Sequence, residues 1–282
     1  MKNEYAAVKD TASDTENSRP CKDGKENRIS GLDGLRTLAI TGVTLFHMFP
    51  HTIRGGWLGV SLFFVLTGCL LAYTSEKSRI SHSFSLRSYI WKRIKRIYPS
   101  LLIMILLTVG IYSILAPDVI KAIRMEVVSV VLGYNNWWQI SENADYFTRM
   151  ANQSPFTHLW FLGIELQYYL LWPLLFGLYI AVSRVLSPRA STFLFLAGGA
   201  AAMGIMPFDF GEGMNITRLY YGTDTRIYAL LLGGALGFYL ARRTSSQEMG
   251  AFRKSGASLL YLFALLFTGA GYVLLDGQFP QV

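Results

Sequence analysis

Seven long apolar stretches are the feature that most limits what this 282-residue chain can fold into. Crossing a bilayer core takes roughly 17 to 25 mostly apolar residues. Because lipid cannot satisfy backbone polar groups, such stretches predict α-helices. The expected spans are Leu35–Pro50, Trp57–Tyr73, Tyr98–Leu115, Leu159–Val182, Thr192–Phe208, Ile227–Ala241 and Ser258–Leu275. The sequence therefore predicts an all-α, polytopic transmembrane helical bundle with about seven spans.

Two further segments fall outside this count. The shorter run Val127–Trp138 carries two asparagines before two tryptophans, which favours an interfacial or re-entrant helix. Residues 1–30 are rich in Lys, Glu, Asp, Asn and Ser and begin with no apolar run, so we expect a disordered tail and no signal peptide. The chain is thus divided into this tail and a transmembrane domain over residues 31–282.

The basic residues orient the bundle. Of the 26 Lys and Arg, 19 fall in the segments that are cytoplasmic when the amino terminus is inside, and 6 fall in the outer segments. Cytoplasmic loops carry the excess of Lys and Arg. We therefore predict a multi-pass protein of the cell membrane, in contact with membrane lipid, with a cytoplasmic amino terminus. The same distribution explains the formal charge of +8 without a nucleic-acid partner.

Ionisable residues inside the expected spans are rare, and each is a candidate functional group because a charge in hydrocarbon needs a partner or a role. Glu165 is the one acid expected well inside a span and His47 the one histidine, while Arg36 lies at the inner mouth of the first span. A rise of about 1.5 Å per residue puts His47 and Glu165 roughly 5 and 9 Å below the outer edge. We expect the two to meet as a catalytic pair; a hydrogen-bonded structural histidine and a transporter's proton relay are the alternatives.

A second set of candidates is basic. Arg93 and Arg96 share a helix face and, with Arg36, are expected to hold the phosphates of a cytosolic donor, although the same stretch also suits a cytoplasmic anchor. Asp224 and Arg226, near the sixth span, form either a structural ion pair or part of an acceptor site.

Two cysteines in different surroundings, and no Cys/His cluster in the sequence, lead us to expect neither a disulfide nor a metal. Gly233-x-x-x-Gly237 has the spacing that lets helix backbones pack closely.

These residues stand inside longer strings: GLDGLRTLAITGVTLFH, GGWLGVSLFFVLTGCLL, RIKRIYP, HLWFLGIELQYYLLWPLLF and TDTRIYALLLGG. In this order they resemble the landmarks of the integral-membrane type 3 acyltransferase family, most closely the membrane half of bacterial peptidoglycan and surface-polysaccharide O-acetyltransferases. The likeness covers residues from about 30 to 240.

The resemblance implies roles for particular residues. The arginine–histidine motif falls on Arg36 and His47, the glutamate of the His-Leu-Trp motif on Glu165, the Arg-x-x-Arg motif on Arg93 and Arg96, and the acceptor side on Asp224, Arg226 and His158.

Two departures from the family pattern bear on this reading. Leu166 stands where many members have a second acid, which argues against a mechanism that needs paired carboxylates. The family usually has about ten spans, sometimes followed by an extracytoplasmic esterase-like domain. We therefore expect the domain over 31–282 to be incomplete at its carboxyl end, with transfer relying on a further extracytoplasmic domain.

The function implied is transfer of an acyl group, usually acetyl from acetyl-CoA as donor substrate, to a hydroxyl of an extracytoplasmic cell-wall carbohydrate. His47 would act either as general base or as acyl carrier, because both roles need the same orienting carboxylate. The alternatives are a proton-coupled transporter or flippase of a glycolipid and a non-catalytic scaffold.

Overall fold

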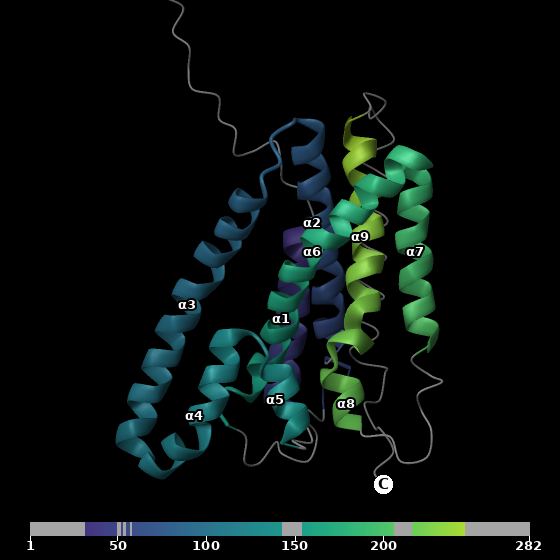
Figure 1. Cartoon of the computed structure of the whole chain (residues 1–282). Helices are drawn as coiled ribbons and strands as arrows, with labels where there is room; N and C mark the ends of the chain where they lie inside the picture. The colour runs from purple at the N-terminus through teal and green to yellow at the C-terminus, as the bar shows by residue number, and fades with distance from the viewer. Residues whose placement is uncertain are drawn as a thin grey trace, which may run out of the picture. The chain divides into compact units, whose positions relative to one another are not determined.

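The structure is a computed structural model that describes residues 32–49, 52, 55–56, 58–142, 154–205 and 216–245. Every regular element among these residues is a helix, which confirms the expected class (Figure 1). The elements are α1 (Leu32–Met48), α2 (Leu58–Ile80), α3 (Leu86–Leu115), α4 (Pro117–Leu132), α5 (Asn135–Ser141), the 3-10 turn η2 (Thr157–Leu159), α6 (Trp160–Val185), α7 (Pro188–Ile205), α8 (Ile216–Tyr221) and α9 (Thr223–Ser245). The tail over 1–30 and the expected span Ser258–Leu275 lie outside the described residues.

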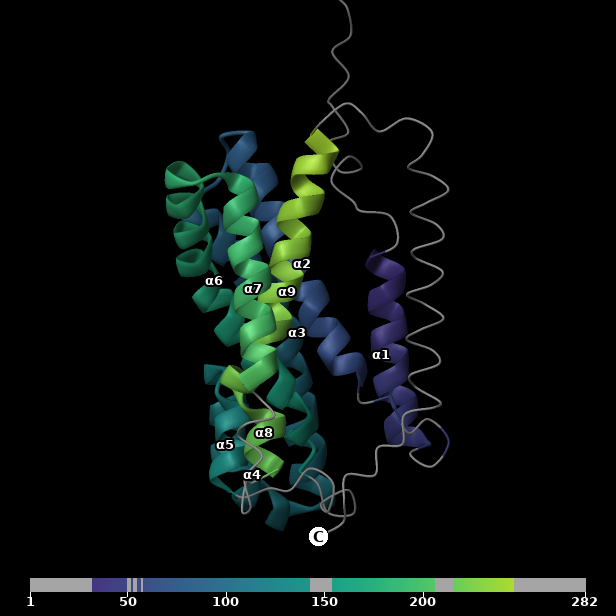
Figure 2. The same ribbon diagram turned by 90° about the vertical axis from the view of Figure 1, so that its right-hand side faces the viewer.

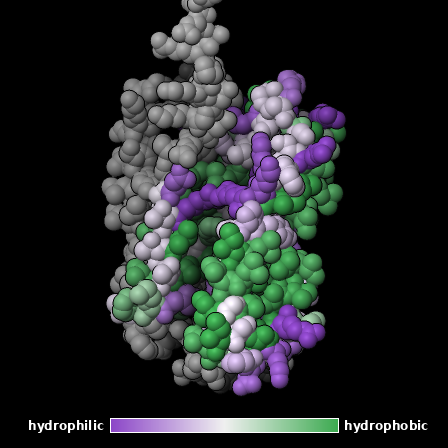
Figure 3. All heavy atoms as spheres, turned by 90° about the vertical axis from the view of Figure 1, so that its left-hand side faces the viewer, coloured by the Kyte–Doolittle hydropathy of each residue, from purple (hydrophilic) through white to green (hydrophobic). Residues whose placement is uncertain are grey.

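The other six expected spans coincide with α1, α2, α3, α6, α7 and α9. Within the described residues, three helical stretches are long and apolar enough to cross a membrane: α2, α3 and the continuous unit Thr157–Val185. The face that carries α3 shows a band of hydrophobic side chains with hydrophilic side chains above and below it (Figure 3). Leu106 and Ile114 of α3 are 71% and 82% exposed, as expected for side chains that face lipid.

The run Val127–Trp138 does not form one helix, because Gly133 interrupts it. Gly133 has a φ of 76°, the left-handed conformation that ends α4, and its backbone N–H donates to the carbonyl groups of Ser129 and Val130. Helix α5 begins two residues later and runs for 7 residues. Helices α4 and α5, on either side of Gly133, lie at the end of the bundle that also holds α8 (Figure 1).

Helices α2 and α9 lie side by side in both ribbon views and pack backbone against backbone (Figures 1 and 2). A Cβ atom added at Gly233 would lie 2.0 Å from the carbonyl oxygen of Val65, and one at Gly237 would lie 2.2 Å from that of Cys69. A Cβ at Gly68 of α2 would lie 2.3 Å from the carbonyl oxygen of Leu230. The close approach expected from the Gly-x-x-x-Gly spacing is therefore confirmed in α9.

An aromatic cluster joins α6, α7 and α9. The rings of Tyr179 and Phe238 stack with centroids 3.7 Å apart, and Phe195 of α7 meets both rings edge-on. Trp172 stacks on Phe238, and its indole N–H donates to the hydroxyl of Ser75 of α2 at 2.9 Å. Since these rings are almost fully buried, they fix the spacing of the helices around them.

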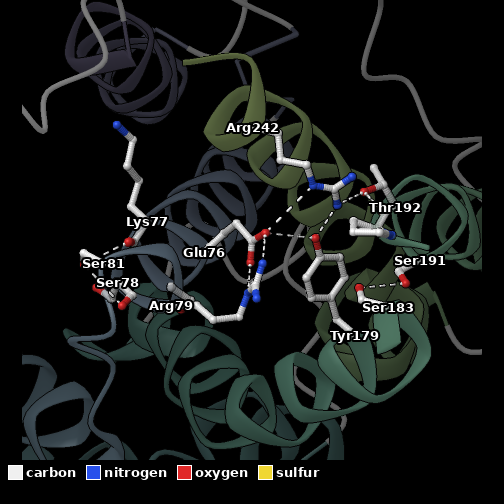
Figure 4. Close-up of polar contacts among 12 residues, drawn as sticks. Glu76, Lys77, Ser78, Arg79, Ser81, Tyr179, Ser183, Ser191, Thr192 and Arg242 are labelled. Atoms are coloured by element: carbon white, nitrogen blue, oxygen red, sulfur yellow. Dashed lines mark hydrogen bonds and ion pairs between the residues drawn. The ribbon is translucent and has the colours of Figure 1, made fainter. Parts of the chain in front are cut away.

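One end of α2 carries a buried charge that the apolar pattern did not predict. Helix α2 continues seven residues beyond Tyr73, and Glu76 in this extension is 0% exposed. Its carboxylate accepts two hydrogen bonds from Arg79 at 2.7 and 2.8 Å and one from the Tyr179 hydroxyl, and lies 3.8 Å from Arg242 of α9 (Figure 4). Glu76 lies beyond the expected span Trp57–Tyr73, so it is a further buried acid, outside that span, besides Glu165. The i,i+3 pairing with Arg79 lets the helix carry a buried charge.

Candidate active site

The Glu165 side chain lies in the second turn of α6 and is 7% exposed. The hydroxyl of Tyr169, one turn further along α6, donates to the Glu165 carboxylate at 2.5 Å. Thr67 of α2 lies beside the same carboxylate, and the charges of Arg36 and Arg96 act on it. A carboxylate buried in the bundle is thus held by one short hydrogen bond and by two cations from other helices.

Of the three arginines expected to form a phosphate cluster, Arg36 and Arg96 act on this acid, and Arg93 lies over the rings of Tyr89 and Tyr169. The Arg93 guanidinium lies 4.0 Å from the ring centre of Tyr89 and 5.9 Å from that of Tyr169. Arg36 reaches in from α1, 5.9 Å from the ring of Phe63, and its Nε is buried with no hydrogen-bond partner among the described residues. Aromatic faces hold the guanidinium groups while leaving N–H donors for a ligand.

His47 lies one residue before the end of α1, and its charge acts on His158 in the 3-10 turn η2. Both histidines are exposed, and the Phe46 ring packs edge-on against His47 at 5.6 Å. Seven residues separate His158 from Glu165, a rise of roughly 10 Å along the helix. The charged groups that act on Glu165 are Arg36 and Arg96, so the pairing of Glu165 with His47 stays a prediction.

Asp224 and Arg226 do not form an ion pair with each other, which corrects that expectation. The Asp224 carboxylate accepts two hydrogen bonds from Arg218 of α8, both at 2.8 Å. Arg226 is buried and donates to the Tyr220 carbonyl oxygen at 3.2 Å and to the Ser61 hydroxyl at 3.1 Å. Two residues apart on a helix, the side chains point in different directions, so each finds its own partner.

Leu166 and its neighbour Gln167 bind α6 to the broken segment. Leu166, at the position of the family's second acid, packs against Gly133, where an added Cβ would lie 3.1 Å from its side chain. The Gln167 amide donates to the backbone carbonyl oxygen of Gly133 and to the side-chain Oδ1 of Asn136, both at 2.9 Å, and accepts from the Thr223 hydroxyl of α9 at 2.5 Å. These contacts hold α6 in the rotation that directs Glu165 toward the arginines.

Besides Glu76, sequence reasoning missed Tyr169 and a third buried acid, Glu126 of α4. The signal for Tyr169 was its i,i+4 spacing from Glu165. Glu126 accepts a hydrogen bond from the Gln139 amide at 2.7 Å, and burial raises the pKa of its carboxyl group, opposed by hydrogen bonds from Ser154 and Gln139. Its partners come from segments far apart in the sequence, so no local pattern could have identified it.

In the residues that the structure describes, no group of three or more His, Cys, Asp or Glu side chains could hold a metal ion. Cys69 is free and buried between α2 and α9. The candidate groups in the described residues are thus the buried acid, the three arginines and the two histidines, and that they form one site stays a prediction.

A bundle of helices with these groups has the make-up of a membrane-embedded acyltransferase domain. The sequence pattern of the family described as "Acyltransferase domain" matches residues 29–280, and the chain belongs to this family.

Among curated proteins, the chain is 34% identical over 212 residues to the O-acetyltransferase OatA of Staphylococcus aureus, covering 74% of this chain and 34% of the relative. It shows the same identity and coverage against the peptidoglycan O-acetyltransferase OatA of Listeria monocytogenes. The chain thus spans about a third of the length of these relatives. No solved structure matches it.

Proposed function

We propose that this chain is a membrane O-acyltransferase domain that moves an acetyl group from cytosolic acetyl-CoA to a hydroxyl of an extracytoplasmic cell-wall carbohydrate. The observation that carries the proposal is that the charges of Arg36 and Arg96 act on the buried Glu165, while Arg93 lies over the ring of Tyr169, the residue that hydrogen-bonds to Glu165. The names of the relatives, O-acetyltransferase and peptidoglycan O-acetyltransferase, supply the acyl group and the class of acceptor.

The arginines form the donor end of the site. Guanidinium groups match phosphate oxygens with paired N–H donors, so three of them suit the phosphates of coenzyme A. Glu165 and the Tyr89 and Tyr169 rings hold these cations before the donor arrives, which reduces the ordering that binding requires. The pantetheine arm then extends along the bundle toward His47.

The histidines form the transfer end. Transfer breaks the C–S bond of the thioester and forms a C–O ester bond, so the proton of the acceptor hydroxyl must reach a base and the departing thiolate must gain a proton. His47 takes the hydroxyl proton, or first accepts the acyl group itself, and His158 beside it contacts the acceptor. The exposure of both histidines gives the acceptor access. Asp224 and Arg226 would line the acceptor side as well.

The test uses the purified full chain in liposomes, with radiolabelled acetyl-CoA on the side of Arg93 and cell-wall glycan fragments on the other. Release of the free coenzyme A thiol and label on the glycan are measured separately, because the first reports the donor half-reaction even when the second needs a further domain.

We expect thiol release that falls at least about 100-fold in His47→Ala, with Arg87→Gln as the unaffected control. Glycolipid movement driven by a proton gradient, with no thiol release, would instead support the transporter alternative.

A further inference from the structure

A second basic cluster lies on the opposite side of the bundle from the arginines of the candidate active site. Helices α7 and α9 stand side by side in both ribbon views, away from α3 (Figures 1 and 2). Between them runs a groove of about 770 Å³, within the usual range of ligand clefts. Arg189, Arg242 and Arg243 line one end of it.

The rest of the groove is apolar and follows one face of each helix. Phe193 and Leu196 of α7 face Leu232 and Leu236 of α9, and Tyr239 lies between these side chains and the arginines. Phe193 is 65% exposed and Leu196 is 48% exposed. From Leu232 to Arg243 the helix rises roughly 16 Å, about half of a bilayer's hydrocarbon thickness. The groove therefore has the length of one lipid leaflet.

Arg242 is held in place from inside the bundle. It donates to the hydroxyls of Tyr179 and of Thr192, the latter at 2.8 Å, and it lies 3.8 Å from Glu76 (Figure 4). Glu76 is also paired with Arg79, so one carboxylate serves two arginines. The sequence of α7 contains no acid, and the one acid of α9, Asp224, is at its other end. The groove's basic end thus carries surplus positive charge on a fixed guanidinium.

We propose that this groove binds one anionic phospholipid, with the phosphate on Arg189, Arg242 and Arg243 and an acyl chain along the apolar wall. A basic end joined to an apolar channel one leaflet long complements an anionic headgroup and its chain. The charge distribution along the sequence predicts that this end faces the cytoplasm, so the lipid comes from the inner leaflet. The site lies apart from Arg36, Arg93 and Arg96.

The experiment is lipid titration of the purified full chain in detergent, read by native mass spectrometry. Phosphatidylglycerol is compared with phosphatidylcholine of the same acyl chains. The double variant Arg189→Gln/Arg243→Gln removes two exposed cations of the groove. The double variant Arg87→Gln/Lys92→Gln removes two exposed cations of α3 and is the charge-matched control.

We expect one tightly held phosphatidylglycerol in the parent and in the control, and about 30-fold weaker binding in the groove variant. Glycerol 3-phosphate, which lacks acyl chains, should not displace it.

Three results would overturn the proposal: equal binding of the two lipids, equal loss in both double variants, or displacement by glycerol 3-phosphate or acetyl-CoA. The first would show that the arginines do not select an anionic headgroup, the second would indicate general interfacial charge, and the third would indicate a site for a soluble phosphate.

Discussion

Replacing Gly233 with alanine should loosen the contact between α2 and α9, because there is no room for even one methyl group. The new Cβ would lie 2.0 Å from the Val65 carbonyl oxygen, 2.9 Å from its carbonyl carbon and 3.0 Å from the Cys69 nitrogen. The closest tolerated approach is about 3.0 Å, so the helices must separate by roughly 1 Å. All three neighbours are backbone atoms, so no rotamer change can relieve the clash.

The magnitude follows from that geometry. Overpacking usually costs about 1–3 kcal/mol, and a clash that only a helix shift relieves belongs at the upper end or beyond. We therefore expect Gly233→Ala to lower the free energy of unfolding by about 3 kcal/mol, a large share of a typical total of about 5–15 kcal/mol. The shift would also disturb Thr67, which is on the same helix as Val65 and lies beside Glu165 of α6.

Unfolding in mixed detergents, followed by tryptophan fluorescence, measures this change. Gly177→Ala is the matched control, since a Cβ at Gly177 meets no described atom within 4 Å. Alanine is the better helix former, so the control should be unchanged or more stable by up to about 1 kcal/mol. Equal stability of the two variants would refute the packing argument.

Three further predictions concern topology, the donor end and the buried acid of α2. A cysteine placed at Ser85 should resist an impermeant reagent added outside cells, since the basic loop is expected in the cytoplasm; labelling from outside would reverse the orientation. Arg36→Ala should raise the KM for acetyl-CoA by about tenfold or more with kcat little changed, as loss of a charged hydrogen bond predicts; a collapsed kcat at constant KM would place Arg36 in the chemical step. Glu76→Gln should lower the unfolding free energy by about 1–3 kcal/mol because Arg79 and Arg242 lose their shared carboxylate; an unchanged melting transition in detergent would contradict this.

The sequence predicts the helices well because the length of an apolar run is a local property. It predicts their ends less well. Helix α3 begins at Leu86, twelve residues before the expected span, because the Ser85 side chain accepts the Ser88 N–H and caps a basic first section. An apolar count cannot detect a helix that continues out of the lipid. The same limitation hid the extension of α2 that carries Glu76.

The partners of charged residues depend on tertiary geometry and were predicted less reliably. Asp224 pairs with Arg218 across Gly222, the residue between α8 and α9, where an added Cβ would lie 2.2 Å from the Arg218 guanidinium. Gly222 is the sequence feature that indicates this ion pair, since a side chain at position 222 would occupy the space of the pair. By contrast, helix periodicity placed Arg93 and Arg96 on one face, and the charges of Arg36 and Arg96 both act on Glu165. That the three arginines form one phosphate site stays a prediction.

The position of Glu165 among arginines allows two roles that kinetics can separate. If the acid orients His47, Glu165→Gln should lower kcat with little change in KM, and the double variant Glu165→Gln/His47→Ala should be hardly worse than the worse single variant, because residues acting as one unit are strongly non-additive. If the acid instead balances Arg36 and Arg96, its neutralisation leaves more positive charge for the donor phosphates, so the KM for acetyl-CoA should fall. We predict the first pattern for kcat, on the grounds of the family motif and of similar depth. Losses that multiply independently, together with a lowered KM, would assign Glu165 to the donor end and leave His47 with His158 as its neighbour.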